Sequence, residues 1–168
     1  KYIQGRLTPV AKKLIKNYKL NNNSKILDVG CGKGYLLFEI KKILPGIKIV
    51  GIDISNYELK NLKKEIKKFL YKFKAQDKYK YKSKYFDLVI SMGTRHNLGI
   101  SDLSKSISEI ERVGKKKYIM VESFRNDQEL FNLQCWALTC ETFLKPNEWI
   151  WLLKNFGYTG DYEFIYFK

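Results

Sequence analysis

The stretch "ILDVGCGKGYL", residues 26–36, decides how this chain is expected to fold. Apolar residues run up to Val29, three glycines follow within five positions, and apolar residues then resume. This order is typical of a buried strand, a tight turn and a helix. Gly30 permits the sharp turn, Gly32 lets the backbone approach a ligand, and Gly34 lets the helix start close to the strand. We therefore expect a ligand to bind at this turn.

Two common nucleotide-binding patterns do not fit the turn. A GxGxxG dinucleotide fingerprint would place its third glycine one residue later, and the GxxxxGK[ST] pattern of a phosphate loop is absent. Asp53 adds a second signal, 23 residues after Gly30. An acid that ends the second strand of such a fold can accept hydrogen bonds from both ribose hydroxyls of an adenosine. The alternative role for this Asp is a strand-end cap.

The size and composition indicate one domain, residues 1–168, with a substantial core. Hydrophobic residues make up 45% of the chain and aromatic residues 15%. No apolar run approaches the roughly 20 residues of a membrane span, and the first residues lack a signal-peptide layout, so we expect a cytoplasmic protein. The three cysteines lack paired spacing and there is one histidine, so we expect neither a disulfide framework nor a metal site.

The net charge of +15 has two explanations. A nucleic-acid-binding surface is one, but only four of the 32 basic residues are Arg, which such surfaces favour for its planar fork. A genome rich in A and T, whose codons supply Lys, Asn and Ile, is the other. The composition favours the second explanation, and we expect no nucleic-acid partner.

The hydrophobic pattern predicts strands that alternate with helices. A helix over 8–19 is expected to start at the pair Thr8-Pro9, and a helix over 101–113 is expected to be capped by Ser101. The remaining elements are strands over 25–30, 47–55, 73–76, 85–93, 116–123 and 158–167, and helices over 33–44, 56–73, 127–141 and 146–156. Because the strands are apolar on both faces, we expect a doubly wound α/β domain with a mostly parallel sheet. Its ligands should lie at the carboxyl ends of the strands.

Three stretches in this order, "ILDVGCGKGYL", "VGIDIS" and "FDLVISMG", resemble the class I S-adenosylmethionine-dependent methyltransferases. The resemblance covers residues 24–122 and implies the Rossmann-like fold of that family and S-adenosylmethionine as cofactor, with S-adenosylhomocysteine as product. A fold that uses another adenosine cofactor is the alternative. The cofactor-binding residues that the resemblance implies are Asp28 in support of the loop, Gly30, Cys31 and Gly32 at the methionine end, Asp53 on the ribose, Ile54 on the adenine, Gln76 or Asp77 on the adenine amino group, and Ser91 and Met92 on the inner wall.

Polar residues after the fourth and fifth strands are the candidates for handling a methyl acceptor. His96 is a candidate general base, and its alternative is an ordinary hydrogen-bonded histidine. Glu122 could hold an acceptor amine or hydroxyl, or it could be a structural partner of an Arg. Arg95 and Arg125 could clamp a carboxylate or phosphate, or form surface ion pairs. The remaining substrate-binding candidates are Asn97, beside His96, and Arg6, in a segment over 1–23 that folds over the cofactor as a lid in many relatives.

The acceptor is expected to be a small molecule. The chain lacks the proline-containing stretch that DNA amino-methyltransferases carry after the fourth strand, and its length leaves no room for a separate target-recognition domain. A looser resemblance over 112–167 is to compact methyltransferases of capsule and lipopolysaccharide gene clusters, which implies a sugar or phosphoramidate acceptor. Two alternatives stay open, an RNA or protein methyltransferase that uses the lysine-rich surface, and a non-catalytic adenosine-binding partner.

Overall fold

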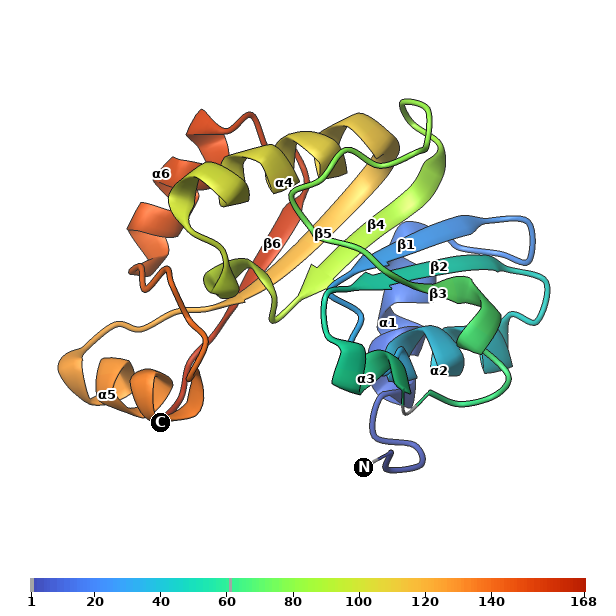
Figure 1. Cartoon of the computed structure of the whole chain (residues 1–168), viewed down its shortest axis with the longest axis horizontal. Coiled ribbons are helices and arrows are strands. Elements are labelled where there is room, and N and C mark those ends of the chain that lie inside the picture. Colours follow the sequence, from blue (N-terminus) through green and yellow to red (C-terminus); the bar gives the residue numbers. More distant parts are fainter. Residues whose placement is uncertain (1, 61) are drawn as a thin grey trace.

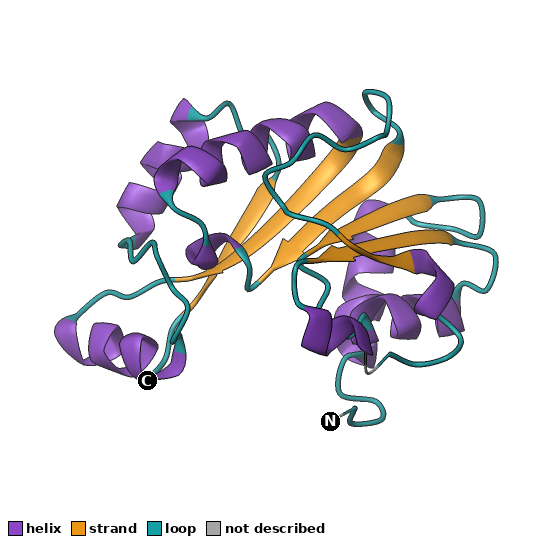
Figure 2. Cartoon of the chain, in the orientation of Figure 1, coloured by secondary structure: helices purple, strands orange, loops and turns teal. Residues whose placement is uncertain are grey.

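The structure of this chain is a computed structural model that describes residues 2–60 and 62–168, so Lys1 and Asn61 lie outside it. Six strands form one parallel sheet in the order β3-β2-β1-β4-β5-β6 (Figures 1 and 2). The strands are β1 (Lys25–Val29), β2 (Lys48–Asp53), β3 (Leu70–Lys72), β4 (Phe86–Met92), β5 (Gly114–Glu122) and β6 (Asp161–Ile165). The predicted doubly wound α/β fold is therefore confirmed.

Helices cover the sheet on both faces, as parallel strands that are apolar on both sides require. One face of the sheet carries α1 (Thr8–Tyr18), α2 (Tyr35–Ile43) and the short α3 (Asn56–Lys60), and the opposite face carries α4 (Ile100–Val113) and α6 (Pro146–Asn155) (Figure 1). Each layer has its own hydrophobic core. Ala11, Leu37 and Ile40 belong to the first core, and Ile107 and Trp149 belong to the second.

A third, smaller cluster holds α5 (Asp127–Trp136) at one end of the molecule. Phe124, Leu133 and Ala137 form its buried centre. Helix α5 ends at Trp136, before the predicted end at residue 141. The reason is that the chain then turns back to the 3₁₀ helix η2 (Arg95–Asn97), where the backbone amides of Glu141 and Thr142 both donate to the carbonyl of His96.

The predicted helix over 56–73 is wrong. Helix α3 ends at Lys60, a 3₁₀ turn spans Lys67–Phe69, and Leu70 starts β3, which pairs with β2 through Gly51. The apolar pattern nevertheless identified core residues, because Ile66 and Leu70 are both buried in the first core. The predicted short strand over 73–76 begins just after the observed β3.

Two predicted helix caps are also wrong. Leu7, and not Thr8, precedes the first turn of α1, and the Thr8 hydroxyl donates to Glu39 Oε2 at 2.6 Å. Helix α4 starts after Gly99, so Ser101 lies inside its first turn and makes no capping hydrogen bond. In both cases the hydroxyl group lies one or two residues beyond the position from which it could accept from the free amides of the first turn.

Gly34 starts α2 in a left-handed conformation with φ of +65°. A Cβ atom there would lie 2.5 Å from Leu70 Cδ2 and 2.9 Å from Ile66 Cδ1. Gly34 therefore allows the loop after β1 to pack against the segment that leads into β3.

We predict that Gly34→Ala lowers the free energy of unfolding by about 2 to 4 kcal/mol, from left-handed strain together with overpacking. Gly157→Ala is the matched control, because Gly157 has φ of +73° but open space around its Cβ position. The control should lose only the stability that the left-handed strain costs, about 1 to 2 kcal/mol. Urea unfolding measures both, and an equal loss in the two variants would contradict the packing role of Gly34.

Candidate functional site

A cavity of about 700 Å³ opens at the carboxyl ends of the strands, where the chain leaves β1 and β4 in opposite directions. This is the position at which doubly wound sheets bind their ligands. Four strands contribute to its wall through the residues that follow them. The lining residues are Gly30, Gly32, Asp53, Ile54, Ser55, Phe73, Ala75, Gln76, Gly93, Thr94, Asn97, Leu98, Gly99, Asp102, Thr139 and Glu141.

The glycine loop forms one wall of this cavity. Gly30 has φ of +80°, and a Cβ atom there would lie 1.9 Å from Thr94 Oγ1, so only glycine lets the loop after β4 approach. Gly32, with φ of +52°, has nothing closer to its Cβ position than Glu58 Oε2, at 3.6 Å. Gly30 is thus needed for packing, whereas Gly32 leaves its backbone open to the cavity.

Asp53 is held at the cavity wall by two backbone amides. Gly32 N donates to Oδ2 and Ser55 N donates to Oδ1, each at 2.8 Å. These bonds orient the carboxylate and join the loop after β1 to the end of β2. Because each carboxylate oxygen accepts more than one hydrogen bond, Asp53 keeps acceptor capacity toward the cavity.

Asp28 lies beneath the same loop and is 4% exposed. Burial, reinforced by the nearby charge of Asp53, raises its pKa from the ordinary 3.8 to about 7, and the Arg95 guanidinium opposes this shift. The two acids thus differ in their surroundings. Asp53 faces the cavity, whereas ionising Asp28 costs desolvation.

Two other residues of the predicted cofactor set line the cavity, and four do not. Ile54, which is 59% exposed, and Gln76 are in the wall. Cys31, Asp77, Ser91 and Met92 are outside it. Ser91 is fully buried and its hydroxyl donates to Val29 O at 2.8 Å, and the Cys31 thiol is turned toward Gly51. Asn97, predicted to bind substrate, also lines the wall.

His96 and Glu122 come together just behind the wall. Both are 3% exposed, and His96 Nδ1 contacts Glu122 Oε2, although the two atoms do not have hydrogen-bond geometry. The Cβ position of Gly93, a wall residue, lies 3.0 Å from Glu122 Oε1. On the other side, the Trp136 ring centre lies 6.0 Å from that of His96. Of the three tryptophans, Trp149 is core and Trp136 is 54% exposed beside this pair.

None of the three Arg side chains predicted to bind substrate lines the cavity. Arg95 is fully buried, donates from Nε to Ser91 Oγ at 2.9 Å and also contacts Ser106 Oγ. Burial lowers its pKa. Arg125 pairs with Glu129 and lies 4.1 Å over the Tyr166 ring, and Arg6 is exposed in the N-terminal turn.

The N-terminal segment, predicted to act as a lid, packs on α2 in this structure. Tyr2 and Thr8 both donate to Glu39 of α2, and the Tyr2 ring lies 5.2 Å from that of Tyr35. Over residues 2–23, no side chain lines the cavity.

The lining also contains residues that the sequence did not indicate. Phe73 and Ala75 were expected within a short strand over 73–76, and in the structure they follow β3, which ends at Lys72. Thr139 and Glu141 come from the turn after α5, far along the chain from Asp102, the wall residue that precedes them in sequence, and nothing local marks them. Among the described residues, no group of three or more His, Cys, Asp or Glu side chains could hold a metal ion, and no helix is long and apolar enough to cross a membrane.

We predict that the stability of the protein falls as pH rises from about 4 to 7, because of Asp28. Over this window the folded chain, with the raised pKa, binds more protons than the unfolded chain, so the free energy of unfolding decreases. Asp28→Asn removes this effect, and the variant should therefore gain stability relative to the wild type between pH 5 and pH 8, measured by urea unfolding. Asp127→Asn, an exposed control on α5, should show the same difference from wild type at both pH values. A constant difference for Asp28→Asn would contradict the raised pKa.

Comparison with known proteins agrees with this geometry. A family model described as a methyltransferase domain matches residues 20–157. The chain is 31% identical over 113 residues to a ribosomal RNA small subunit methyltransferase C from Buchnera aphidicola, covering 65% of this chain and 32% of that protein. It is 32% identical over 74 residues to a tRNA (guanine-N(7)-)-methyltransferase from Mycoplasma capricolum, covering 44% of this chain and 34% of that protein.

A solved structure with a similar fold is the geranyl diphosphate C-methyltransferase from Streptomyces coelicolor, in complex with Mg²⁺, geranyl diphosphate and S-adenosylhomocysteine. Its TM-score is 0.70 at 10% identity, covering 88% of this chain and 60% of that one. This chain spans about a third of the length of the two curated relatives. The family model covers most of the chain, including the glycine loop and every strand from β1 to β5, and the chain therefore belongs to the methyltransferase domain family.

Proposed function

We propose that this chain transfers a methyl group from S-adenosylmethionine to an oxygen or nitrogen of a small acceptor. The observation that carries the proposal is the pairing of Gly32 and Asp53 at the ends of neighbouring strands. An open glycine backbone and a fixed carboxylate face one cavity and are joined by a hydrogen bond of 2.8 Å. Membership of the methyltransferase domain family supports the same cofactor.

The chemistry of the wall fits the parts of this cofactor. The Asp53 carboxylate offers two acceptor oxygens to the ribose hydroxyls. Ile54, Phe73 and Ala75 offer apolar surface to the adenine, and Gln76 lies beside them with an amide that can hydrogen-bond its edge. The volume of about 700 Å³ is within the usual range of small-molecule sites.

When bound, the cofactor supplies an electrophilic methyl group on a sulfonium, so the chain has mainly to position the acceptor and to take its proton. The new bond from the acceptor oxygen or nitrogen forms as the S–C bond breaks, and the electron pair stays on sulfur. We assign removal of the acceptor's proton to the His96–Glu122 pair, because this pair is buried next to Gly93 of the wall and no other His is present in the chain.

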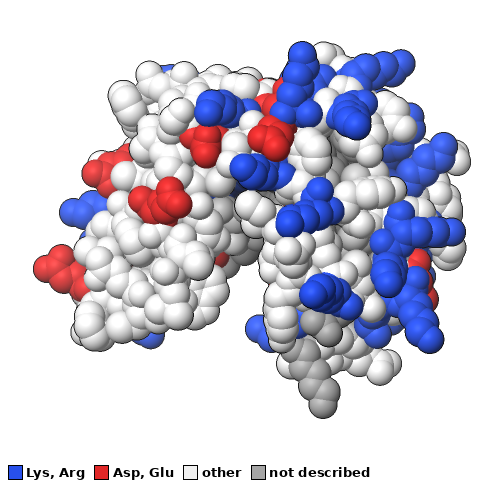
Figure 3. All heavy atoms as spheres, in the orientation of Figure 1, with Lys and Arg blue, Asp and Glu red and all other residues white. Residues whose placement is uncertain are grey.

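A small acceptor is favoured over RNA by the position of the charge. Two curated relatives act on RNA by name, but no Lys or Arg among the residues that the structure describes lines the cavity. Figure 3 shows the Lys and Arg side chains of this face gathered mostly over the half that carries β1–β3, α2 and α3. A surface-polysaccharide precursor as the acceptor stays a prediction from the looser resemblance.

We predict that Asp53→Asn weakens binding of S-adenosylhomocysteine roughly tenfold or more, because one hydrogen-bonded charge is lost. Isothermal titration calorimetry measures the affinity. Asp77→Asn is the matched control, since Asp77 is exposed and outside the wall. The control should bind like the wild type. Unchanged affinity in Asp53→Asn would remove the ribose role, and a loss in Asp77→Asn would move the adenine contact to that residue.

We predict that His96→Gln lowers methyl transfer while the affinity for S-adenosylhomocysteine stays within about twofold, because the proton acceptor and not the cofactor site is changed. Transfer of a labelled methyl group into the small-molecule fraction and into total RNA of a cell extract measures activity. Label in the small-molecule fraction supports the proposal, and salt-sensitive label in RNA would favour the alternative acceptor. Normal transfer by the variant at every pH would exclude His96 as the base, and cofactor binding without any transfer would favour the non-catalytic alternative.

A further inference from the structure

The cavity wall is acidic although the chain is strongly basic. Its ionisable members are Asp53, Asp102 and Glu141, and it contains no Lys, Arg or His. The chain as a whole carries a net charge of +15. Within residues 2–60 and 62–168, no Lys or Arg lines this cavity, and three carboxylates do, which disfavours anionic ligands.

Two of the three carboxylates already have partners. Asp53 accepts from two backbone amides. Asp102 accepts from Gln76 Nε2 at 3.1 Å and pairs with Lys105 at 2.9 Å. Within residues 2–60 and 62–168, the Glu141 carboxylate makes neither a hydrogen bond nor an ion pair. Glu141 is therefore the wall carboxylate without a partner in the described part of the chain, whereas Asp53 keeps only the acceptor capacity that its two backbone bonds leave.

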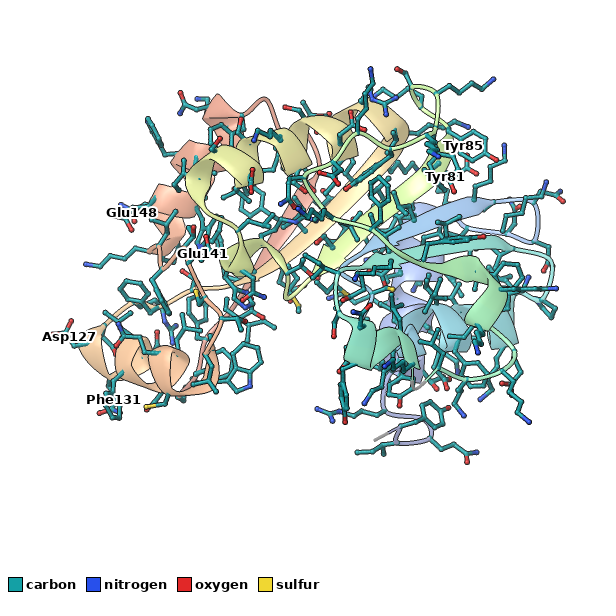
Figure 4. All side chains as sticks on the ribbon, in the orientation of Figure 1. Tyr81, Tyr85, Asp127, Phe131, Glu141 and Glu148 are labelled. Carbon is teal, nitrogen blue, oxygen red and sulfur yellow. The ribbon has the colours of Figure 1, made fainter. Side chains whose placement is uncertain are left out.

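The backbone around Glu141 is firmly attached to the wall. Glu141 N donates to His96 O at 2.8 Å, and Thr142 Oγ1 donates to Leu98 O at 2.7 Å. The carboxylate lies beside Gly99, whose Cβ position is 3.1 Å from Glu141 Oε2, and Figure 4 shows Glu141 next to the turn that leads into α4. The turn after α5 thus holds Glu141 at the cavity rather than leaving it on a loose loop.

A second hydrogen bond from this turn reaches the wall, since Thr139 Oγ1 donates to Asn97 Oδ1 at 2.8 Å. This bond occupies the amide oxygen of Asn97 and leaves its NH₂ group as the donor of that side chain. Glu141 and Asn97 therefore present an acceptor and a donor on the same side of the cavity.

The buried carboxylate of Glu122, which contacts His96, adds a further acidic group just behind the same wall. It is 3% exposed, its Oε1 lies against Gly93 of the wall, and its Oε2 has no hydrogen bond within the described part of the chain. A buried acceptor atom without a donor is costly unless a ligand or a neighbouring charge satisfies it. The contact with His96 Nδ1 places one such partner on its inner side.

The basic groups that could reverse this charge are used elsewhere. Arg95 is turned into the core against Ser91 and Ser106, and Arg125 is paired with Glu129. Neither Arg forms the anion clamp that the sequence suggested, and the charge of Glu141 would repel a carboxylate or phosphate placed next to it.

We propose that the methyl acceptor carries a cationic ammonium group and that Glu141 binds this group. The inference rests on the proposed function for the identity of the site, and it adds the chemical class of the acceptor. Glu141 is then a specificity-determining residue. It selects an amine-bearing molecule over neutral or anionic molecules of the same shape.

The test uses three sets of simple probes, each with an amine, a neutral alcohol and a carboxylate of similar size: ethanolamine, ethylene glycol and glycolate; benzylamine, benzyl alcohol and benzoate; glucosamine, glucose and glucuronate. Saturation-transfer NMR measures binding of each probe to the whole chain, with and without S-adenosylhomocysteine. We expect the amine of each set to bind tightest, by roughly three- to tenfold for a partly exposed ion pair. Glu141→Gln should abolish the preference and Glu141→Lys should reverse it. Asp127→Asn, which removes one exposed carboxylate at the outer end of α5 (Figure 4), should leave it unchanged.

The outcomes separate this inference from the proposed function. Calorimetry with S-adenosylhomocysteine reports on the cofactor site alone, and Glu141→Gln should keep that affinity. If S-adenosylhomocysteine binds but the amines show no preference, or if the preference survives Glu141→Gln, the inference about Glu141 is wrong and the methyltransferase proposal stands. If the amines are preferred but S-adenosylhomocysteine does not bind, the proposed function is wrong and the cation site remains.

Discussion

The whole site depends on the absence of side chains in the loop after β1. The absence of a Cβ atom at Gly30 leaves room for Thr94 from the loop after β4, and its absence at Gly34 leaves room for Leu70 from the start of β3. These two close approaches bring the ends of four neighbouring strands around one cavity. The amide of Gly32 then orients the Asp53 carboxylate. A Cβ atom at Gly30 would displace Thr94 of the cavity wall, and one at Gly34 would displace Leu70 of the core. The shape of the cavity wall and the packing of the sheet therefore depend on the same glycine loop.

A buried polar layer under the cavity separates its chemistry from the surface charge. Arg95, His96 and Glu122 are at most 3% exposed, and Asp28 lies beside them at 4%. Burying such polar groups is costly unless they are hydrogen-bonded, and Arg95 is bonded to the hydroxyl groups of Ser91 and Ser106. Two of these buried residues, Arg95 and His96, belong to η2. The turn after α5 is attached to η2 through backbone hydrogen bonds to the His96 carbonyl. The lysine-rich surface takes no part in this arrangement, which is why a basic chain can present an acidic cavity.

The strands next to the sheet centre were predictable from sequence because each is a short apolar run that is buried on both faces. β1, β2, β4 and β5 lie within or close to the predicted ranges. The segment over 56–73 was not predictable, because Ile66 and Leu70 have helical spacing but do not belong to one helix. Both side chains pack over Gly34, yet Leu70 lies in β3 and pairs with Gly51, whereas Ile66 precedes the 3₁₀ turn. The spacing of apolar residues favours a helix here, but pairing with β2 places Leu70–Lys72 in a strand, so the tertiary contact overrides the local preference.

For the site, the sequence by itself determined the elements that are continuous along the chain: the glycine loop, the acid that ends β2, and the presence of Ile54, Gln76 and Asn97 near the strand ends. Only the tertiary structure decided which polar residues face the ligand. Arg95 and His96 are adjacent to Asn97 in sequence, yet both are buried behind the cavity wall, whereas Asn97 lines it. Glu141 comes from a distant turn through backbone bonds to His96. The direction of a side chain depends on the backbone around it, and contacts between distant segments leave no local pattern in the sequence.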